Sequence, residues 1–243
     1  MSARFDFSGQ LVLVTGGSSG IGLAIARGFR DAGAQVSITG TKSSIANYPD
    51  DLSAFSYHQV NMLDVPAVEA LAESFDKLDV LVNNAGTTFR GAAAYEPENF
   101  EATIDINLNS VYRLCHRLQP KLQPSGGSII NIASMTSYFG SPRGPGYGAS
   151  KSAILQMTKS LGALWAQSGV RVNAIAPGWI STNLTAPIQD MPDIADPILQ
   201  RTPMGRWGKP DEMIGTALFL ASADAAGFIT GVTIPVDGGY TSL

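Results

Sequence analysis

Tyr147 and Lys151 stand four residues apart, and Ser134 lies upstream of both. On a helix, positions i and i+4 share one face, so the phenol and the ammonium can point into one pocket. A free phenol titrates near ~10, and a neighbouring ammonium favours the phenolate and lowers that pKa. The spacing therefore predicts an acid/base pair that works near neutral pH. The alternative is a tyrosine and a lysine on a solvated helix face.

A glycine-rich stretch from Thr15 to Gly22 follows the apolar run 10–15 and precedes a helical pattern that begins at Ile21. Glycine permits positive φ and lets a ligand approach the backbone closely. The N-terminus of the following helix presents free N–H groups and the positive end of a dipole. This order of strand, glycine turn and helix predicts a binding site for a pyrophosphate.

The same stretch contains Gly16-Gly17-Ser18-Ser19-Gly20, which matches the G-x-S-x-G turn of serine hydrolases. That alternative needs a histidine partner and an oxyanion hole. The chain has no His-Gly-Gly stretch, and its two histidines, His58 and His116, both precede the C-terminal half. The sequence therefore disfavours a hydrolase, and reaction with a fluorophosphonate probe would favour it.

Short apolar runs alternate with helical patterns along the whole chain. Strands are predicted at 10–15, 35–39, 58–61, 78–83, 128–134, 170–176 and 230–236, and helices at 21–31, 67–75, 97–121, 146–167 and 211–221. The alternation and the nearly continuous apolar strands favour an α/β fold, a three-layer Rossmann fold whose doubly wound parallel sheet has about seven strands and helices on both faces.

No repeat or low-complexity linker divides the chain, so residues 1–243 are interpreted as one domain. The segment 42–57 leaves little room for a full helix. The stretch 181–209 is rich in Pro, Met and Asp and lacks a long period, which favours a substrate-binding lid at 183–206. The alternative is an ordinary surface loop.

The composition argues against several classes of function. The 16 Lys and Arg against 20 Asp and Glu give a net charge of −4, and no basic cluster predicts a nucleic-acid surface. No apolar stretch predicts a membrane span or a signal peptide, and the lone Cys115 predicts a reduced, cytoplasmic protein. No histidine spacing predicts a metal site.

Five motifs in this order make the chain resemble the short-chain dehydrogenase/reductase family, over essentially all 243 residues. Thr15–Gly22 matches its T-G-x-x-x-G-x-G loop, and residues 83–86 match its N-N-A-G motif. Asn107, Ser134, Tyr147 and Lys151 fall at its catalytic spacing, and residues 177–182 resemble its P-G-x-I-x-T segment. The overall pattern is most similar to the 3-oxoacyl-carrier-protein reductase-like branch.

The resemblance implies a hydride transfer between a nicotinamide cofactor and a ketone or secondary alcohol, without a metal. Tyr147 would be the acid/base, Lys151 would lower its pKa and bind the nicotinamide ribose, Ser134 would orient the carbonyl, and Asn107 would hold a water in a proton relay. Met135 and Trp179 would line the substrate pocket with Ser134 and Tyr147. The implied cofactor-binding residues are Gly16, Ser18, Ser19, Gly20, Ile21, Gly22, Thr41, Lys42, Asn61, Met62, Asn83, Ala85, Gly86, Tyr147, Lys151, Pro177, Gly178, Ile180 and Thr182.

The end of the second strand bears on the choice of cofactor. NAD-selective folds place Asp or Glu there, against the ribose hydroxyls. Gly40 holds that place here, followed by Thr41 and Lys42, which favours NADP(H), with NAD(H) possible. Alternatively, Lys42 is only a solvated surface residue. Asn61 stands where relatives often have Asp, and its carbonyl can still accept a hydrogen bond from adenine.

We expect an uncharged or weakly polar substrate from the mostly apolar candidate pocket, and NADPH-dependent carbonyl reduction. The alternatives are an NAD-dependent alcohol, sugar or steroid dehydrogenase working oxidatively, and a non-catalytic dinucleotide-binding regulator. The resemblance also implies a homotetramer that packs the two long helices and the C-terminal strand across two-fold axes. The apolar stripes on those helices would otherwise belong to the core.

Overall fold

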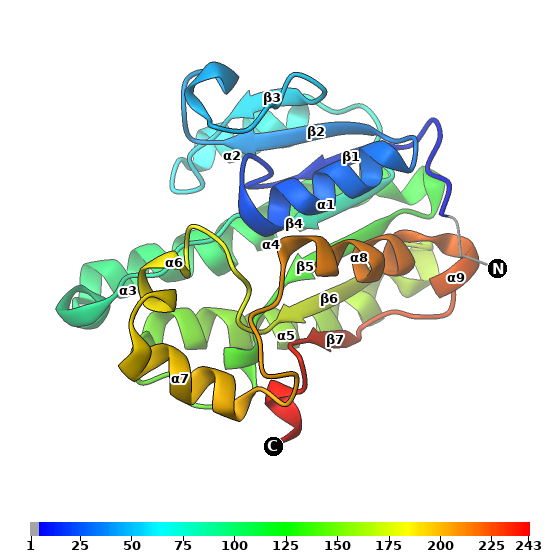
Figure 1. The fold of residues 1–243 in the computed structure, drawn as a ribbon. Coiled ribbons are helices and arrows are strands. Elements are labelled where there is room, and N and C mark those ends of the chain that lie inside the picture. The colour runs from blue at the N-terminus through cyan, green and yellow to red at the C-terminus, as the bar shows by residue number, and fades with distance from the viewer. Residues whose placement is uncertain (1–4) are drawn as a thin grey trace.

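A seven-stranded sheet forms the centre of the computed structural model, which describes residues 5–243 (Figure 1). Every pair of neighbouring strands is parallel, in the order β3-β2-β1-β4-β5-β6-β7. The strands are β1 (Leu11–Val14), β2 (Gln35–Gly40), β3 (Ser56–Gln59), β4 (Val80–Asn83), β5 (Ser128–Ile132), β6 (Arg171–Pro177) and β7 (Thr233–Val236). The predicted doubly wound parallel sheet is confirmed.

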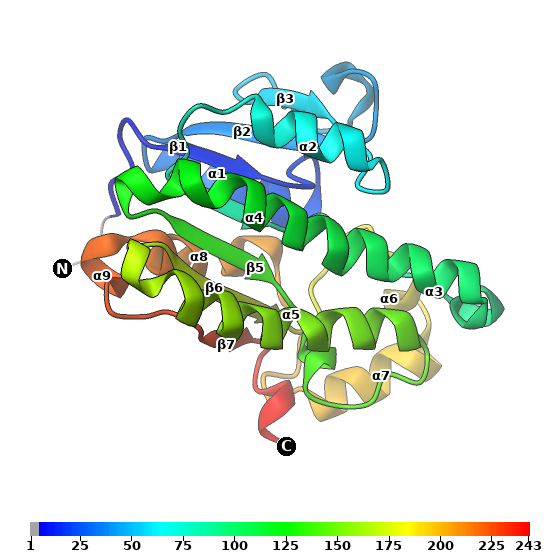
Figure 2. The ribbon, with the colours of Figure 1, turned by 180° about the vertical axis from the view of Figure 1, so that it is seen from behind.

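Helices cover both faces of the sheet. They are α1 (Gly20–Asp31), α2 (Val65–Glu73), α3 (Pro97–Ile104), α4 (Ser110–Leu122), α5 (Pro145–Trp165), α6 (Ala186–Gln189), α7 (Pro192–Arg201), α8 (Ile214–Ala221) and α9 (Ala223–Ala226). Helices α1 and α8 lie in front of the sheet in Figure 1, and α2, α4 and α5 lie in front of it in Figure 2, which views the molecule from behind. The sheet is therefore the middle of three layers.

Alternation along each strand divides the apolar side chains between two cores. Val12 and Val14 point into the core that α1 and α8 close, whereas Leu13 points into the core that α2, α4 and α5 close. All three are at most 1% exposed. Because both faces are buried, the strands need apolar residues at every position.

The strand order reverses beside β1, which pairs with β2 on one side and β4 on the other. Chain segments that leave the carboxyl ends of β1 and β4 therefore diverge and open a crevice, where doubly wound folds bind ligands. The glycine-rich stretch follows β1 and the N-N-A-G stretch follows β4, so the topology brings these two motifs together.

The structure departs from the predicted elements in three places. The predicted helix 97–121 is two helices joined by a π-helical turn at Asp105–Asn109. The stretch 183–206 contains the short α6 and the ten-residue α7, whose period the sequence analysis missed. The predicted helix 211–221 starts as a 3₁₀ turn at Pro210–Met213. Segment 42–57 holds no full helix, as expected, but only a 3₁₀ turn at Ile45–Asn47 and the first two residues of β3.

Candidate active site

The glycine-rich stretch turns sharply between β1 and α1. Gly16 and Gly20 adopt φ values of +63° and +54°, a region that L side chains disfavour. The Gly16 N–H donates to Thr39 Oγ1 at 2.9 Å, and a Cβ on Gly16 would lie 2.9 Å from Ala85 Cα. The loop therefore lies directly against the segment that follows β4.

Gly22 brings the first turn of α1 against the same segment. A Cβ on Gly22 would lie 2.3 Å from Asn84 Nδ2 and 2.4 Å from the Gly16 carbonyl oxygen. Within the described chain, the N-cap Ser19 makes no side-chain capping hydrogen bond, so the helix N-terminus is left to an external acceptor. This bare backbone and its dipole fit a pyrophosphate.

Asn84 joins the two motifs, although it was not among the predicted site residues. Its backbone N–H and that of Ala85 each donate to Thr15 Oγ1 at 3.0 Å, and its side-chain amide donates to the carbonyls of Thr15 and Gly16 at 3.0 and 3.1 Å. The N-N-A-G motif was the available signal. Asn84 holds the loop in shape, so a ligand would contact its neighbours.

Asn83 points into the core. It is 2% exposed, and its amide donates to Asn131 Oδ1 at 2.9 Å and to Cys115 Sγ at 3.2 Å. The Asn131 amide donates in turn to Thr158 Oγ1 at 3.0 Å. Burial raises the pKa of the Cys115 thiol to about 12, so this cysteine is packed and unreactive.

Lys151 is 4% exposed and its ammonium donates to the Ile132 carbonyl at 2.7 Å. Its nitrogen lies 5.8 Å from the centre of the Tyr147 ring. Burial lowers the pKa of Lys151 to about 8, because a desolvated ammonium is costly. The i, i+4 spacing on α5 thus brings the two side chains together, as predicted.

The Tyr147 hydroxyl lies beside Ser134, and a hydrogen bond joins them. Burial raises the pKa of the Tyr147 phenol, and the bond from Ser134 opposes this only in part. The direction is opposite to the one expected from the ammonium, because desolvation of the phenolate outweighs the hydrogen bond from Ser134. Ser134 is fixed as the cap of a 3₁₀ turn, where its Oγ accepts from Thr136 N at 3.2 Å.

Asn107 lies in the π-helical turn and is fully buried. Its Oδ1 accepts from Thr87 N at 2.8 Å, and its amide donates to the Thr87 carbonyl at 2.9 Å and to Ser150 Oγ at 3.1 Å. A Cβ on Gly86 would lie 3.2 Å from Asn107 Oδ1 and 3.6 Å from Lys151 Nζ. Asn107 therefore fixes the chain after β4 against α5, and its relay role stays a prediction.

Tyr48 lies at the end of β2, where the cofactor choice was expected to be made. Its hydroxyl accepts from Lys42 N at 3.0 Å and lies 3.3 Å from the Tyr57 hydroxyl. Burial raises the pKa of the Tyr48 phenol, but its hydrogen bonds with Tyr57, Lys42, Ser18 and Thr41 together outweigh burial and lower that pKa overall. Sequence analysis missed Tyr48 because only the fold brings it back to Gly40.

Lys42 and Asn61 are both exposed and both already have local partners. The Lys42 ammonium donates to the Asn47 carbonyl at 2.5 Å and lies 4.9 Å from the centre of the Tyr48 ring. Asn61 Oδ1 accepts from Leu63 N at 3.1 Å, which leaves a second lone pair for adenine. The neighbouring Met62 is buried.

The segment 177–182 leaves β6 and reaches the glycine loop. Pro177 ends β6, and Gly178 packs so tightly that a Cβ would lie 2.6 Å from Asp237 Cα. Ile180 is 4% exposed, and Thr182 Cγ2 lies 3.4 Å from a Cβ placed on Gly20. The fold thus brings the predicted P-G-x-I-x-T segment to the glycine-rich turn.

Met135 and Trp179 were predicted to line the substrate pocket with Ser134 and Tyr147. Met135 is buried. Trp179 packs edge-on against Trp207, at 5.6 Å between ring centres, and lines a cavity with Thr202, Asp237 and Gly238 whose walls include none of Ser134, Tyr147 and Lys151. Arg90 is exposed and donates to the Leu184 carbonyl, which ties the chain after β4 to the start of the 183–206 segment.

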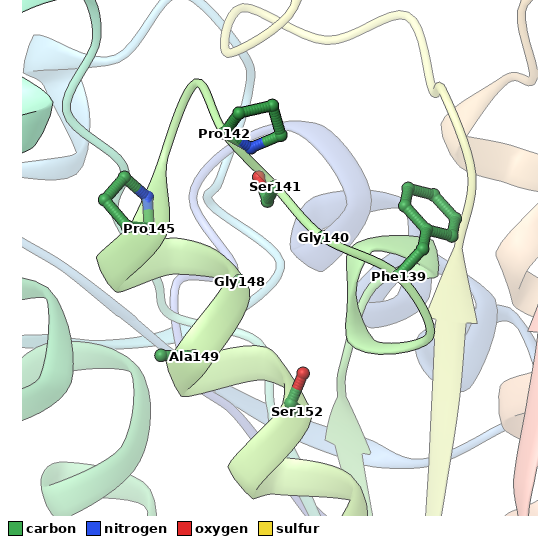
Figure 3. A pocket seen from close by; sticks show the side chains of 8 residues that line it. All are labelled: Phe139, Gly140, Ser141, Pro142, Pro145, Gly148, Ala149 and Ser152. Carbon is green, nitrogen blue, oxygen red and sulfur yellow. The ribbon is translucent and has the colours of Figure 1, made fainter.

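A second cavity lies between residues 139–142 and the first turns of α5 (Figure 3). Its walls are Phe139, Gly140, Ser141, Pro142, Pro145, Gly148, Ala149 and Ser152. Ser152 Oγ donates to the Ser137 carbonyl at 3.1 Å, and a Cβ on Gly148 would lie 2.9 Å from Ser141 Cβ. These contacts hold the Ser134 segment against the helix that carries Tyr147.

Across residues 5–243, no three His, Cys, Asp or Glu side chains are grouped to bind a metal ion. None of the helices in that range is long and apolar enough to cross a membrane. The Ser18 hydroxyl bonds the Tyr48 phenol, while His58 packs against Phe75 and His116 against Tyr112. This arrangement does not favour the hydrolase alternative.

Comparison with known proteins places these motifs in context. The family described as enoyl-(acyl carrier protein) reductase matches residues 16–241. A 2-dehydro-3-deoxy-D-gluconate 5-dehydrogenase from Bacillus subtilis is 40% identical over 98% of this chain and 97% of its own. A 3-oxoacyl-[acyl-carrier-protein] reductase from Synechocystis sp. is 38% identical over 95% and 96%.

A solved structure of a gluconate 5-dehydrogenase from Burkholderia cenocepacia, in complex with NADP and tartrate, is 35% identical. It superposes with a TM-score of 0.90 and covers 99% of this chain and 98% of its own. The predicted preference for NADP(H) agrees with the NADP bound in that neighbour. The similarity spans the β1–α1 turn, the N-N-A-G stretch and α5 alike.

Proposed function

Because the chain belongs to the short-chain dehydrogenase/reductase family, we propose that Ser134, Tyr147 and Lys151 are its catalytic residues. The protein is an NAD(P)(H)-dependent oxidoreductase that interconverts a ketone and a secondary alcohol. The observation that supports this assignment is that the Ser134 and Tyr147 hydroxyls lie beside the buried Lys151 ammonium.

The bound nicotinamide supplies the hydride, and the side chains handle position and protons. In reduction, Tyr147 donates its proton to the carbonyl oxygen, and Ser134 donates a hydrogen bond that orients that oxygen. The raised pKa of Tyr147 keeps the phenol protonated and ready to donate. The Lys151 ammonium stabilises the phenolate that remains, as a charge held beside the ring in a buried site.

Gly16, Gly20 and Gly22 would hold the pyrophosphate on the bare N-terminus of α1. Ile180 and Thr182 would hold the nicotinamide, since their segment meets the glycine loop. Residues 183–206 would act as a substrate lid in one domain of 243 residues, supported by the contact from Arg90 to Leu184.

The substrate proposed is a polyhydroxylated acid of the sugar-acid class. Several similar proteins are named as dehydrogenases of such acids. The exposed Arg90 at the base of the proposed lid can pair with a carboxylate. This differs from the uncharged substrate expected from the sequence. A 3-oxoacyl thioester is the second candidate, supported by the 38% identity to the Synechocystis enzyme.

A substrate panel read at 340 nm tests both candidates. The purified protein would be assayed with 5-keto and 5-hydroxy sugar acids, their uncharged polyol counterparts and acetoacetyl thioesters, each with NADPH/NADP⁺ and NADH/NAD⁺. We expect kcat/KM to be highest for a sugar acid with NADP(H). Highest turnover of the thioester would shift the assignment to acyl reduction, and an equal or higher kcat/KM with NADH would overturn the cofactor preference.

We also propose a cytoplasmic homotetramer that packs α4 and α5 between copies. Ile154 and Leu161 on α5 belong to the core, whereas Leu164 on α5 is 69% exposed and Tyr112 on α4 is 50% exposed. These two exposed side chains support an interface. Light scattering after size exclusion tests it, with Leu164→Glu expected to dissociate the assembly; a monomeric wild-type protein would overturn it.

A further inference from the structure

The Tyr48 hydroxyl lies where a side chain on residue 40 would begin. A Cβ on Gly40 would be 2.3 Å from the Tyr48 oxygen and 3.0 Å from Ser18 Oγ. Ser18 belongs to the glycine loop and Gly40 ends β2. The Tyr48 oxygen therefore lies at the junction of loop and strand, the point at which dinucleotide-binding folds contact the 2′ position of the adenosine ribose.

This oxygen is held in place before any ligand binds. Lys42 N donates to it at 3.0 Å, and the Lys42 ammonium reaches back to the Asn47 carbonyl at 2.5 Å. The same segment is tied to α1 by the ion pair between Arg27 and Asp50 at 3.0 Å. Tyr48 is thus part of a fixed turn whose anchor is the helix that follows the glycine loop.

The hydroxyl still has a proton to donate. Tyr57 donates its proton to the Lys42 carbonyl and Lys42 N donates to the Tyr48 oxygen, so the Tyr48 O–H faces the Tyr57 oxygen, 3.3 Å away, until another acceptor arrives. A phenol O–H rotates to suit its acceptor, so the Tyr48 proton can turn toward a ligand. The Lys42 ammonium lies 4.9 Å from the centre of the Tyr48 ring, and its charge favours an anionic acceptor.

We propose that Tyr48 is a specificity-determining residue that donates a hydrogen bond to the substituent on the 2′ carbon of the cofactor's adenosine ribose. In other dinucleotide-binding folds, a side chain at the position of Gly40 contacts this 2′ substituent. Here Tyr48 makes that contact instead. This inference rests on the cofactor function proposed above. A phosphate oxygen is charged and a hydroxyl is not, so the bond from Tyr48 favours NADP(H) over NAD(H).

Isothermal titration of the purified full-length protein tests the assignment. Tyr48→Phe and the control Tyr95→Phe would be titrated with NADP⁺, NAD⁺, 2′,5′-ADP and 5′-AMP. Tyr95 is an exposed tyrosine in the 3₁₀ turn Gly91–Tyr95, so its variant makes the same chemical change away from β2. Tyr48→Phe should weaken the binding of NADP⁺ and 2′,5′-ADP about tenfold, but the binding of NAD⁺ and 5′-AMP only about threefold. The control should bind all four as wild type does.

Gly40→Ala gives an independent route to the same group, because its Cβ would displace the Tyr48 hydroxyl. Gly40→Ala should weaken NADP⁺ binding about as much as Tyr48→Phe does. The double variant should lose little more NADP⁺ affinity than either single variant, because both changes act on the same hydroxyl. Additive losses, or NADP⁺ affinity within twofold of wild type in folded Tyr48→Phe, would overturn the role of Tyr48. A wild-type protein that binds neither NADP⁺ nor 2′,5′-ADP would overturn the cofactor function itself.

Discussion

Lys151 on α5 donates a 2.7 Å hydrogen bond to the carbonyl of Ile132, the last residue of β5. Ser134 follows two residues later, so one lysine connects the helix that carries Tyr147 to the strand that delivers Ser134. The connection requires a buried ammonium, which is unfavourable for folding and useful for chemistry. Three of the predictions below concern this group of residues.

Lys151→Met should remove a pH dependence of stability. Burial lowers the pKa of Lys151 from 10.5 to about 8, so between these values the unfolded chain binds more protons than the folded one. Wild-type stability therefore rises with pH across that range, by about 3 kcal/mol relative to Lys151→Met. Urea unfolding at pH 7 and pH 10 measures this. Lys159→Met, which alters an exposed lysine of the same helix, should leave the rise intact.

The same lowered pKa predicts how turnover depends on pH. Reduction needs the Lys151 ammonium to stabilise the Tyr147 phenolate, so kcat/KM with NADPH should fall as pH rises through about 8. Initial rates between pH 6 and 10, in buffers of constant ionic strength, give the profile of the free enzyme. A kcat/KM that stays flat to pH 9.5 would contradict this role of Lys151.

Tyr147→Phe should lower kcat by about 10²- to 10⁴-fold, because it removes only the proton that the reaction uses. The affinity for NADP⁺, titrated by fluorescence, should change by less than about twofold, since the ring remains in place. Tyr138→Phe, which alters an exposed tyrosine of the same region, is the control and should retain wild-type turnover. Wild-type turnover by Tyr147→Phe would instead favour a different acid or a regulatory role.

Asn107→Ala should destabilise the protein by about 2–4 kcal/mol. The change leaves the N–H and carbonyl of Thr87 and the hydroxyl of Ser150 without their buried partner. Asn109→Ala lies in the same π-helical turn but on its exposed side, and should cost less than about 0.5 kcal/mol. Chemical denaturation measures the free energy of unfolding of both variants. Equal losses would mean that the hydrogen bonds of Asn107 to Thr87 and Ser150 do not stabilise the fold.

Gly22→Ala should abolish NADP⁺ binding, because its Cβ would collide with Asn84 and with the Gly16 carbonyl. Gly215→Ala is the matched control: this helical glycine on α8 has nothing within 4 Å of the new Cβ. It should stabilise the protein by about 0.5–1 kcal/mol through higher helix propensity. Thermal melts with and without NADP⁺ separate the two, and a ligand-induced shift in Gly22→Ala would refute the close packing.

Local chemistry in the sequence was sufficient for much of this protein. Two-sided apolar strands specified a covered parallel sheet, and i, i+4 spacing placed Tyr147 and Lys151 on one face of α5. Glycines at 16 and 20 predicted a turn that needs positive φ. These features depend on residues near one another in the chain, where backbone geometry limits the possibilities.

Tertiary structure decided what depends on distant neighbours. The direction of the Tyr147 pKa shift follows from how deeply the fold buries the phenol, and i, i+4 spacing alone does not reveal that depth. Trp179 lies within the P-G-x-I-x-T segment, yet its ring packs against Trp207 and lines a cavity apart from Ser134 and Tyr147. Tyr48 reaches Gly40 because the turn that carries it is held to α1 by the ion pair between Arg27 and Asp50. Burial of the phenol and packing between distant segments therefore decided these features, because neither follows from the spacing of residues along the chain.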